Sequence, residues 1–516
     1  MPRFKIYHSI LALGLMAGFS SCDKDFEEVN TNPNASTNPN ADYLFSQAIL
    51  RGNYIYDRAY FYTSYLNAGM YVQHYATYKD VNGSGVGDKY GLSDQYHGFY
   101  FLYLYPNVLN TLNESIRAAE KQGLTNKVAT GRIWRALQFQ RLTDIYGDVP
   151  YKDALKGHID GSFLPAYTPQ SEIYDDLLKE LDESIAALDA TKPTFGAADF
   201  IYQGDVAKWK KFGYSLMLRV AMRLTKIDEN KAKTWAQKAI AGGVIENAAD
   251  NASVAYFNTG QTYNYNPIAF ELVGQDYKSD AYGDANQEGG KFSKKFIDQL
   301  KDNNDPRLPV MAVTFTGTTA TNDPALAKGL PNGTMSKPTD FKTYSEPNPA
   351  TILAFNSPVL VITNAEMAFL LAEAALRNWT NANTASAYFK KGIENNMRNW
   401  AKFGPAGVIS ETAINDYTAA HPLNTGGSVN DQMNQIHTQF WIALLLDEQE
   451  SYANWRRTGY PQLTPVNVTG NQTGGVIPRR FPYLRNERSN NKVNYDNAVS
   501  RQGTDNLLTR VWWDKQ

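Results

Sequence analysis

The fold class is clearest in residues 363–393, which read TNAEMAFLLAEAALRNWTNANTASAYFKKGI. Thr363 can cap the first turn of a helix, and Glu366, three residues later, can reach back to complete a capping box. Apolar residues at helical spacing then form two facing stripes: Met367, Leu370, Leu371 and Ala374 in the first helix, and Ala385, Tyr388, Phe389 and Ile393 in the second. A short polar turn joins the helices, so the stretch predicts a helix-turn-helix of tetratricopeptide size.

The same pattern recurs earlier in the chain. Apolar periodicity predicts paired helices over residues 107–121 and 127–146 and over residues 169–189 and 205–226, followed by a shorter helix over residues 231–241. Gly242-Gly243 directly after the last of these is typical of a left-handed helix end. The repeats are too degenerate for a regular solenoid. We therefore expect a mainly all-α domain over residues 43–516, built from tetratricopeptide-like helix pairs.

Two long stretches interrupt the helical pattern. Residues 251–290 carry several tyrosines among Asn, Gly, Asp and Gln, and residues 314–350 are rich in Thr, Gly, Asn and Pro. The backbone of such insertions must stay near water, and long insertions in a domain are commonly functional or mobile. We expect both to be irregular loops that form the variable face of the domain.

The first residues are similar to a bacterial lipoprotein signal. A basic start is followed by an apolar stretch too short to span a bilayer, and Ser20-Ser21 precede Cys22, the only cysteine of the chain. We expect residues 1–21 to be removed and Cys22 to be acylated, for example with palmitate. Residues 22–42 would then hold the lipidated cysteine and an Asn/Pro/Thr-rich flexible tether. The alternative is an ordinary cleaved signal with a chance cysteine.

The remaining composition limits the partners. After Cys22 no stretch approaches the 18 or so apolar residues of a membrane-spanning helix, so only a lipid would attach the chain to a membrane. Lys plus Arg total 50 against 52 for Asp plus Glu, a net charge of −2, which offers no overall field for a nucleic acid. The six His residues lie apart without an HExxH pattern and no EF-hand loop occurs, so we expect neither a metal nor a cofactor.

Several motifs follow one another along residues 40–516. They are residues 135–151, a helix that runs into Gly147-Asp148-Val149-Pro150-Tyr151, then Thr168-Pro169 before Ile173-Tyr174, Lys208-Trp209 before residues 216–223, Asp305-Pro306-Arg307, residues 365–375, residues 455–461, and residues 477–483 followed by Trp512-Trp513-Asp514. In this joint order they resemble the SusD/RagB family of nutrient-binding outer-membrane lipoproteins. Most of these residues also have structural roles, since Arg456 and Arg457, for instance, can satisfy buried carboxylates or helix-end carbonyls.

The resemblance implies a helical SusD-like fold and a defined task. Members of the family sit on the outer leaflet of the outer membrane, on the cell surface, as a lid over a SusC-like TonB-dependent transporter. They capture oligosaccharides or, in some members, peptides, and they are not enzymes. A lid has to open and close against its partner, which suits a rigid helical body with mobile loops.

A glycan ligand would stack on aromatic rings and form hydrogen bonds with amide and carboxylate side chains. The candidates are therefore aromatic and polar residues of the expected loops, around the Gly-rich residues 81–87 and in the insertion 251–290. They are Tyr78, Asn82, Tyr90, Tyr96, Tyr263, Asn264, Tyr265, Asp276, Tyr277 and Tyr282. Ordinary packing is the competing interpretation for each tyrosine, and the run from Tyr54 to Tyr75 has helical spacing and is expected in the core.

Two other functions remain open. A secreted helical glycoside hydrolase would need two carboxylates across a cleft, for which Asp144 with Asp148, or Asp447 with Glu450, can be considered. Acidic residues near helix ends are common caps or ion-pair partners, however, and no Gly-x-Ser-x-Gly elbow is present. A tetratricopeptide scaffold that binds only proteins would need no polar and aromatic ligand pocket.

Overall fold

The computed structural model describes residues 39–53, 58–79, 87–157, 161–277, 289–316 and 319–515. The expected signal peptide, Cys22 and most of the tether lie outside these residues, as do Asn82 and Tyr282. The helical body begins with α3 (Ala41–Gly52). Among the described residues, no helix combines the length and the apolar character needed to cross a membrane.

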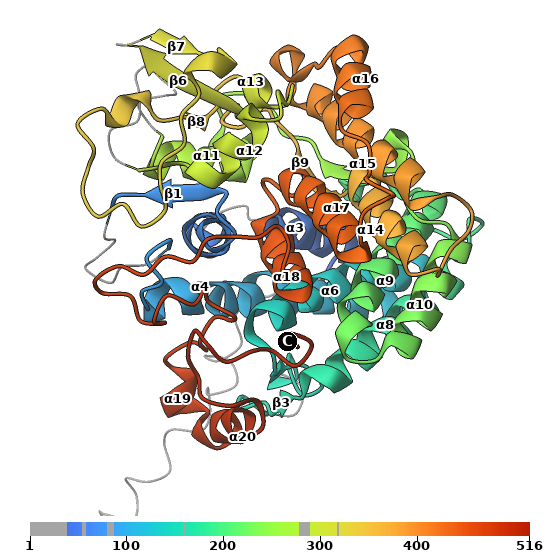
Figure 1. Cartoon of the computed structure of the whole chain (residues 1–516). Coiled ribbons are helices and arrows are strands. Elements are labelled where there is room, and N and C mark those ends of the chain that lie inside the picture. Colours follow the sequence, from blue (N-terminus) through green and yellow to red (C-terminus); the bar gives the residue numbers. More distant parts are fainter. Residues whose placement is uncertain are drawn as a thin grey trace, which may run out of the picture. The chain divides into compact units, whose positions relative to one another are not determined.

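The predicted helix pairs are confirmed. Helix α5 (Asn110–Lys121) packs on α6 (Thr125–Tyr146), α8 (Gln170–Ala187) on α9 (Val206–Arg223), α9 on α10 (Glu229–Gly242), and α14 (Asn364–Leu376) on α15 (Ala385–Asn399) (Figure 1). Gly243 ends α10 with a positive φ of 93°, a conformation that costs glycine little. The chain is thus mainly helical, as the periodicity predicts.

The facing stripes of α14 and α15 meet as expected. Met367, Leu370, Leu371 and Ala374 are buried on α14, and Tyr388, Phe389 and Ile393 are buried on α15. Gly392 permits the close approach, because a Cβ atom there would lie only 2.7 Å from the ring of Phe369. A larger residue would have to displace that ring from the core.

The remaining helices complete the body. A fully buried π-helix, Tyr60–Gly69, packs against α18 (Glu448–Thr458) and α4 (Asp94–Leu104), which places the described part of the tyrosine-rich run in the core as predicted. The described residues further include the α-helices α11 (Pro267–Gln275), α12 (Lys294–Lys301), α13 (Leu308–Met311), α16 (Glu411–Ala420), α17 (Val429–Ala443), α19 (Glu487–Asn490) and α20 (Lys492–Gln502).

Short antiparallel strands join distant segments. β1 (Tyr75–Thr77) pairs with β5 (Gly290–Phe292), β2 (Val149–Pro150) with β3 (Tyr167–Thr168), and β4 (Ala252–Val254) with β9 (Val359–Ile362). In a three-stranded sheet, β6 (Ala312–Thr316) lies between β7 (Thr319–Thr321) and β8 (Glu346–Pro347). The two insertions expected to be irregular therefore contain α11 and several of these strands, because long-range pairing orders short segments that carry no local signal.

Buried ion pairs tie the helices together. Arg219 of α9 donates to both carboxylate oxygens of Glu366 on α14, at 2.6 and 2.7 Å. Thr363 does cap α14 by accepting from the Glu366 backbone N–H, but the Glu366 carboxylate binds Arg219 instead of closing the expected capping box. Arg457 likewise donates to both oxygens of Glu373 at 2.8 and 2.6 Å, as expected for an arginine that satisfies a buried carboxylate.

Candidate ligand-binding site

Three of the predicted segments meet at one end of the β1–β5 pair. Thr77, the last residue of β1, lies opposite Gly290, the first residue of β5. Tyr78 follows Thr77 directly, and Asp276, just after α11, accepts the Gly290 N–H at 3.1 Å. The end of β1, the end of α11 and the start of β5 are therefore neighbours, although the first lies about 200 residues before the others in the sequence.

Two further loops join this place. The Asn332 amide donates to Tyr75 O at 2.9 Å, which holds residues 328–344 beside β1. On the other side, Gln73 donates to Thr464 O at 2.5 Å. In Figure 1 the yellow segment between β7 and β8 runs beside β1. We call this meeting of residues 77–79, 87–90, 276–277, 328–344 and 464–476 the loop face.

Aromatic and cationic side chains line the loop face. The half-buried ring of Tyr78 stands edge-on to the buried ring of Phe341, with centroids 4.9 Å apart. The exposed Lys337 holds its ammonium 5.9 Å from the Tyr78 ring and 5.7 Å from the Phe341 ring. Such an arrangement offers an apolar ring surface beside hydrogen-bond donors, which is the chemistry that a sugar requires.

A buried carboxylate supports the loops below these rings. Asp88 accepts hydrogen bonds from the Gly333 N–H at 2.9 Å and from the Lys89 ammonium at 3.0 Å. Burial raises the pKa of Asp88, and Lys89 opposes that shift. Lys89 also donates to Thr77 O at 2.6 Å. The Asp88–Lys89 pair therefore fastens residues 328–344 to the end of β1, where Tyr78 begins the loop.

Three of the predicted ligand tyrosines are buried in the scaffold. Tyr90 and Tyr277 are fully buried and Tyr96 is 6% exposed. Tyr90 accepts the Val466 N–H, Tyr277 donates to Gly290 O at 2.8 Å, and Tyr96 packs on Tyr62 with centroids 4.5 Å apart. A ring with no free face cannot stack on a sugar, and in this structure Tyr90 and Tyr277 support the loops while Tyr96 belongs to the helical core.

The other predicted cluster lies at the opposite end of α11. Tyr263 is 54% exposed, whereas Tyr265 is half-buried and stacks on Phe355 with centroids 4.5 Å apart. Asn264 donates to the Thr259 hydroxyl at 2.8 Å. The nine residues of α11 separate this cluster from Asp276 by about 13 Å along the helix axis. The structure therefore places Tyr78 and Asp276 together but sets Tyr263, Asn264 and Tyr265 apart.

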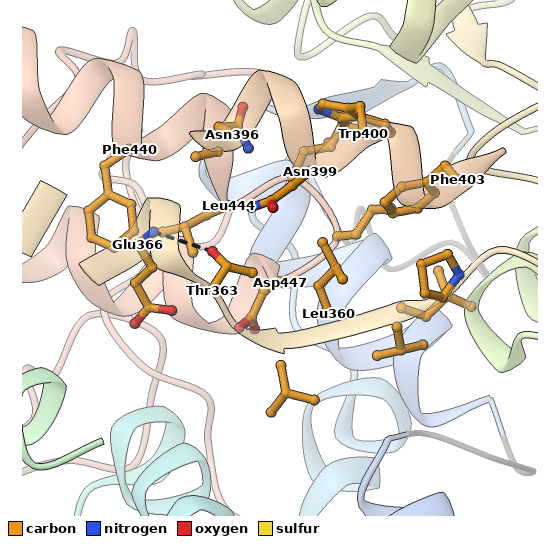
Figure 2. A pocket seen from close by; sticks show the side chains of 17 residues that line it. Leu360, Thr363, Glu366, Asn396, Asn399, Trp400, Phe403, Phe440, Leu444 and Asp447 are labelled. Carbon is orange, nitrogen blue, oxygen red and sulfur yellow. Dashed lines mark hydrogen bonds between the residues drawn. The ribbon is translucent and has the colours of Figure 1, made fainter. Parts of the chain in front are cut away.

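Away from the loop face, a hollow lies between β9, the end of α15 and the link between α17 and α18. Figure 2 shows the carboxylates of Glu366 and Asp447 at one end and the rings of Trp400 and Phe403 at the other. The cavity measures about 50 Å³, enough for a few waters but far below the roughly 300 Å³ or more of a small-molecule site. This hollow therefore suits hydration of the buried carboxylates and is too small for an oligosaccharide.

The carboxylates considered for a hydrolase are engaged in ion pairs. A hydrolase needs a carboxylic acid and a carboxylate that face each other across an accessible cleft. Instead, all four side chains are bound by arginines: Asp144 by Arg223 (3.2 Å), Asp148 by Arg501 (3.0 Å), Asp447 by Arg141 (3.6 Å) and Glu450 by Arg223 (2.5 Å). Their arrangement supports the fold and provides no catalytic pair.

Lys337 and Phe341 are not among the ligand-binding residues predicted from the sequence. They belong to the insertion 314–350, which the composition marks as a variable face, but nothing local distinguishes them from neighbouring residues. The one signal in the sequence is the presence of two lysines and two aromatic residues close together, Lys337, Phe341, Lys342 and Tyr344. Their place near the candidate site becomes evident only from the hydrogen bond of Asn332 to β1, which brings this loop beside Tyr78.

Comparisons with known proteins agree with this architecture. The sequence matches the SusD-like family, described as starch-binding and associating with the outer membrane, over residues 33–484. No curated protein matches at a significant level.

Among solved structures, a chitin-binding protein is 31% identical, with a TM-score of 0.79 over 92% of this chain and 100% of its own. A SusD-like protein of Bacteroidetes AC2a is 25% identical (TM-score 0.80; 93% and 100% covered). A chitin-binding SusD homolog from Flavobacterium johnsoniae is 26% identical (TM-score 0.77; 92% and 99% covered). With its paired helices, its ordered motifs and a family match over most of its length, the chain belongs to the SusD-like family.

Proposed function

We propose that this protein is a cell-surface lipoprotein that binds oligosaccharides at the loop face and delivers them to a SusC-like TonB-dependent transporter. The observation that carries the proposal is the meeting of Tyr78, Lys337 and Asp276 at one end of the β1–β5 pair. A ring surface and a donor lie there side by side, and Asp276 is hydrogen-bonded to the start of β5, which lies opposite the end of β1. Cys22, through its lipid, would hold this body on the outer membrane.

Glycans are favoured over peptides as the ligand class. Two of the similar structures are chitin-binding proteins, and the family is described as starch-binding. The described part of the loop face presents the half-buried ring of Tyr78 and the exposed ammonium of Lys337, two groups that suit a sugar. N-acetylglucosamine oligomers and starch oligomers are therefore the first ligands to test, with peptides as the comparison.

The test is titration calorimetry on the soluble form that lacks residues 1–22. We expect binding of an N-acetylglucosamine or starch oligomer without turnover, and weaker binding by Tyr78→Ala. Covering one face of the ring removes roughly 50 Å² of apolar surface from water, worth about 1 kcal/mol or a five- to tenfold change in affinity. Tyr43→Ala is the matched control, because Tyr43 is a 63% exposed tyrosine on α3.

Three outcomes would contradict the proposal. Equal affinity of Tyr78→Ala and the wild type would remove the loop face as the site. Release of shortened sugars during the titration would indicate a hydrolase. Binding of peptides but of no glycan would replace the ligand class.

For the delivery step, the full-length lipoprotein purified from outer membranes in mild detergent should retain a TonB-dependent barrel. Recovery of the protein without any barrel would argue against its role as a lid.

A further inference from the structure

A group of aromatic rings away from the loop face is exposed to solvent. Phe257 is 60% exposed, Tyr263 is 54% exposed and Phe270 is 42% exposed. The rings of Tyr265 and Phe355 stack on each other, and the ring of Phe270 lies 6.1 Å from each, while Phe257 and Tyr263 lie on the segment that leads into α11. We call these five rings the aromatic platform. Large exposed rings gathered in this way mark interaction sites more often than single exposed apolar residues do.

The platform is held in a fixed conformation. Asn266 is its anchor: its backbone N–H donates to Phe355 O at 2.7 Å, and its side chain donates to Ser357 O at 2.9 Å and caps α11 at Ala269. At the other side of the loop, the Phe257 N–H donates to Asn264 O at 2.7 Å. A backbone that is ordered before a ligand arrives loses little conformational entropy on binding.

The two segments that carry the platform contain no charged residue. Residues 251–270 and 349–365 contain no Asp, Glu, Lys or Arg, although charged residues make up 20% of the chain. The exposed polar groups beside the rings are amides and hydroxyls, from Asn258, Thr259, Gln261 and Thr262. Neutral sugars present C–H faces that stack on rings and hydroxyls that bond to amides. An anionic ligand would find no cation in these two segments.

We propose that the aromatic platform is a second contact site for a neutral glycan, which engages the same chain that the loop face holds. The proposal rests on glycan binding at the loop face and extends it. Helix α11 spans the distance between the two sites, so a short oligosaccharide reaches only one of them and a longer chain or a polysaccharide reaches both. Two linked contacts raise the affinity for the longer ligand by their effective concentration.

The experiment compares the double variant Phe257→Ala/Tyr263→Ala with the wild type. Phe163→Ala/Tyr43→Ala serves as the matched control, because these two rings are also exposed, at 77% and 63%, and lie outside the platform. The probes are the N-acetylglucosamine dimer and colloidal chitin, together with maltose and soluble starch. We expect unchanged dimer affinity and at least tenfold weaker binding of the polysaccharide that the wild type binds, with the control unchanged.

The outcomes separate the two proposals. If the wild type and the double variant bind the polysaccharide equally, the platform proposal is overturned and glycan binding at the loop face stands. If the wild type binds no glycan of the panel, both proposals fall. If polysaccharide binding is unchanged while recovery of the barrel with the full-length variant is reduced, the platform is a protein interface and the second glycan site is refuted.

Discussion

Replacing Arg457 by methionine tests whether buried ion pairs hold the helical body together. Arg457 of α18 is 1% exposed and binds Glu373 of α14, whose side chain is fully buried. Burial alone would raise the pKa of Glu373, but Arg457 and His437 outweigh it and hold the pKa well below its ordinary value. Arg457→Met keeps much of the side-chain volume and leaves the carboxylate in an apolar environment without its main partner.

The expected loss of stability is large at neutral pH. Removing one partner of a buried pair costs about 3–5 kcal/mol. For a unit that spans Ala41–Gln516, an unfolding entropy of about 2.1 cal/mol/K per residue amounts to roughly 1 kcal/mol/K, so Tm should fall by about 3–5 °C. The same fall in Tm should accompany Arg219→Met, because Arg219 binds Glu366 in the same manner.

The loss should depend on pH in a defined direction. In the wild type the depressed pKa of Glu373 contributes stability above the ordinary carboxyl pKa, and that contribution disappears as the pH falls. In Arg457→Met, burial is opposed only by Arg377 and His437, so the pKa of Glu373 in the folded state rises from its depressed value. The variant then gains a proton as the pH falls toward 5, so its deficit in Tm should be smaller at pH 5 than at pH 8.

Differential scanning calorimetry at both pH values measures these differences. Arg398→Met is the matched control, since Arg398 is 40% exposed and pairs with the exposed Glu411. An exposed pair is worth at most about 1 kcal/mol, so Tm should change by 1 °C or less. The reasoning is refuted if Arg457→Met melts within 1 °C of the wild type at pH 8, or if its deficit is the same at pH 5.

Two further predictions concern a buried acid and the anchor. Burial raises the pKa of Glu448 from 4.5 to about 7, so the folded state loses stability as the pH rises through this interval. In calorimetry, Glu448→Gln should therefore melt up to about 3 °C above the wild type at pH 8 and at the same temperature as the wild type at pH 4.5. Cys22→Ser should abolish labelling by a palmitate analogue and move the protein out of the membrane fraction; a labelled variant would disprove the anchor.

The helix pairs were predictable because their signals are local. The apolar residues of α14 and α15 are spaced about one helical turn apart, so they form a stripe along each helix. Burial of the two stripes against each other removes them from water. The capping box at Thr363 failed for a non-local reason. The Glu366 carboxylate binds Arg219, which lies 147 positions away in the sequence, and hydrophobic periodicity does not reveal such a partner.

The candidate site was predicted only in part, for the same reason. Tyr78 and Tyr90 have similar polar neighbours in the sequence, yet one ring is half-buried at the surface and the other is fully buried against Val466. The pairing of β1 with β5 and the docking of residues 464–476 decide that difference. Composition could mark the loops as a face, but only the long-range pairing shows which side chains face outward.

The structure also explains why family motifs identify the scaffold and not the ligand. Loss of Arg219 or Arg457 would leave a carboxylate buried without its partner at a cost of about 3–5 kcal/mol, a large part of the stability of any domain. Replacing the exposed Tyr263 changes stability by only about 0.5 kcal/mol. Substitutions of the exposed side chains of the loop face and the aromatic platform are therefore tolerated by a body whose buried charges resist change. One helical scaffold can in this way present different sugar-binding surfaces, so ligand preference has to be inferred from the exposed rings and amides.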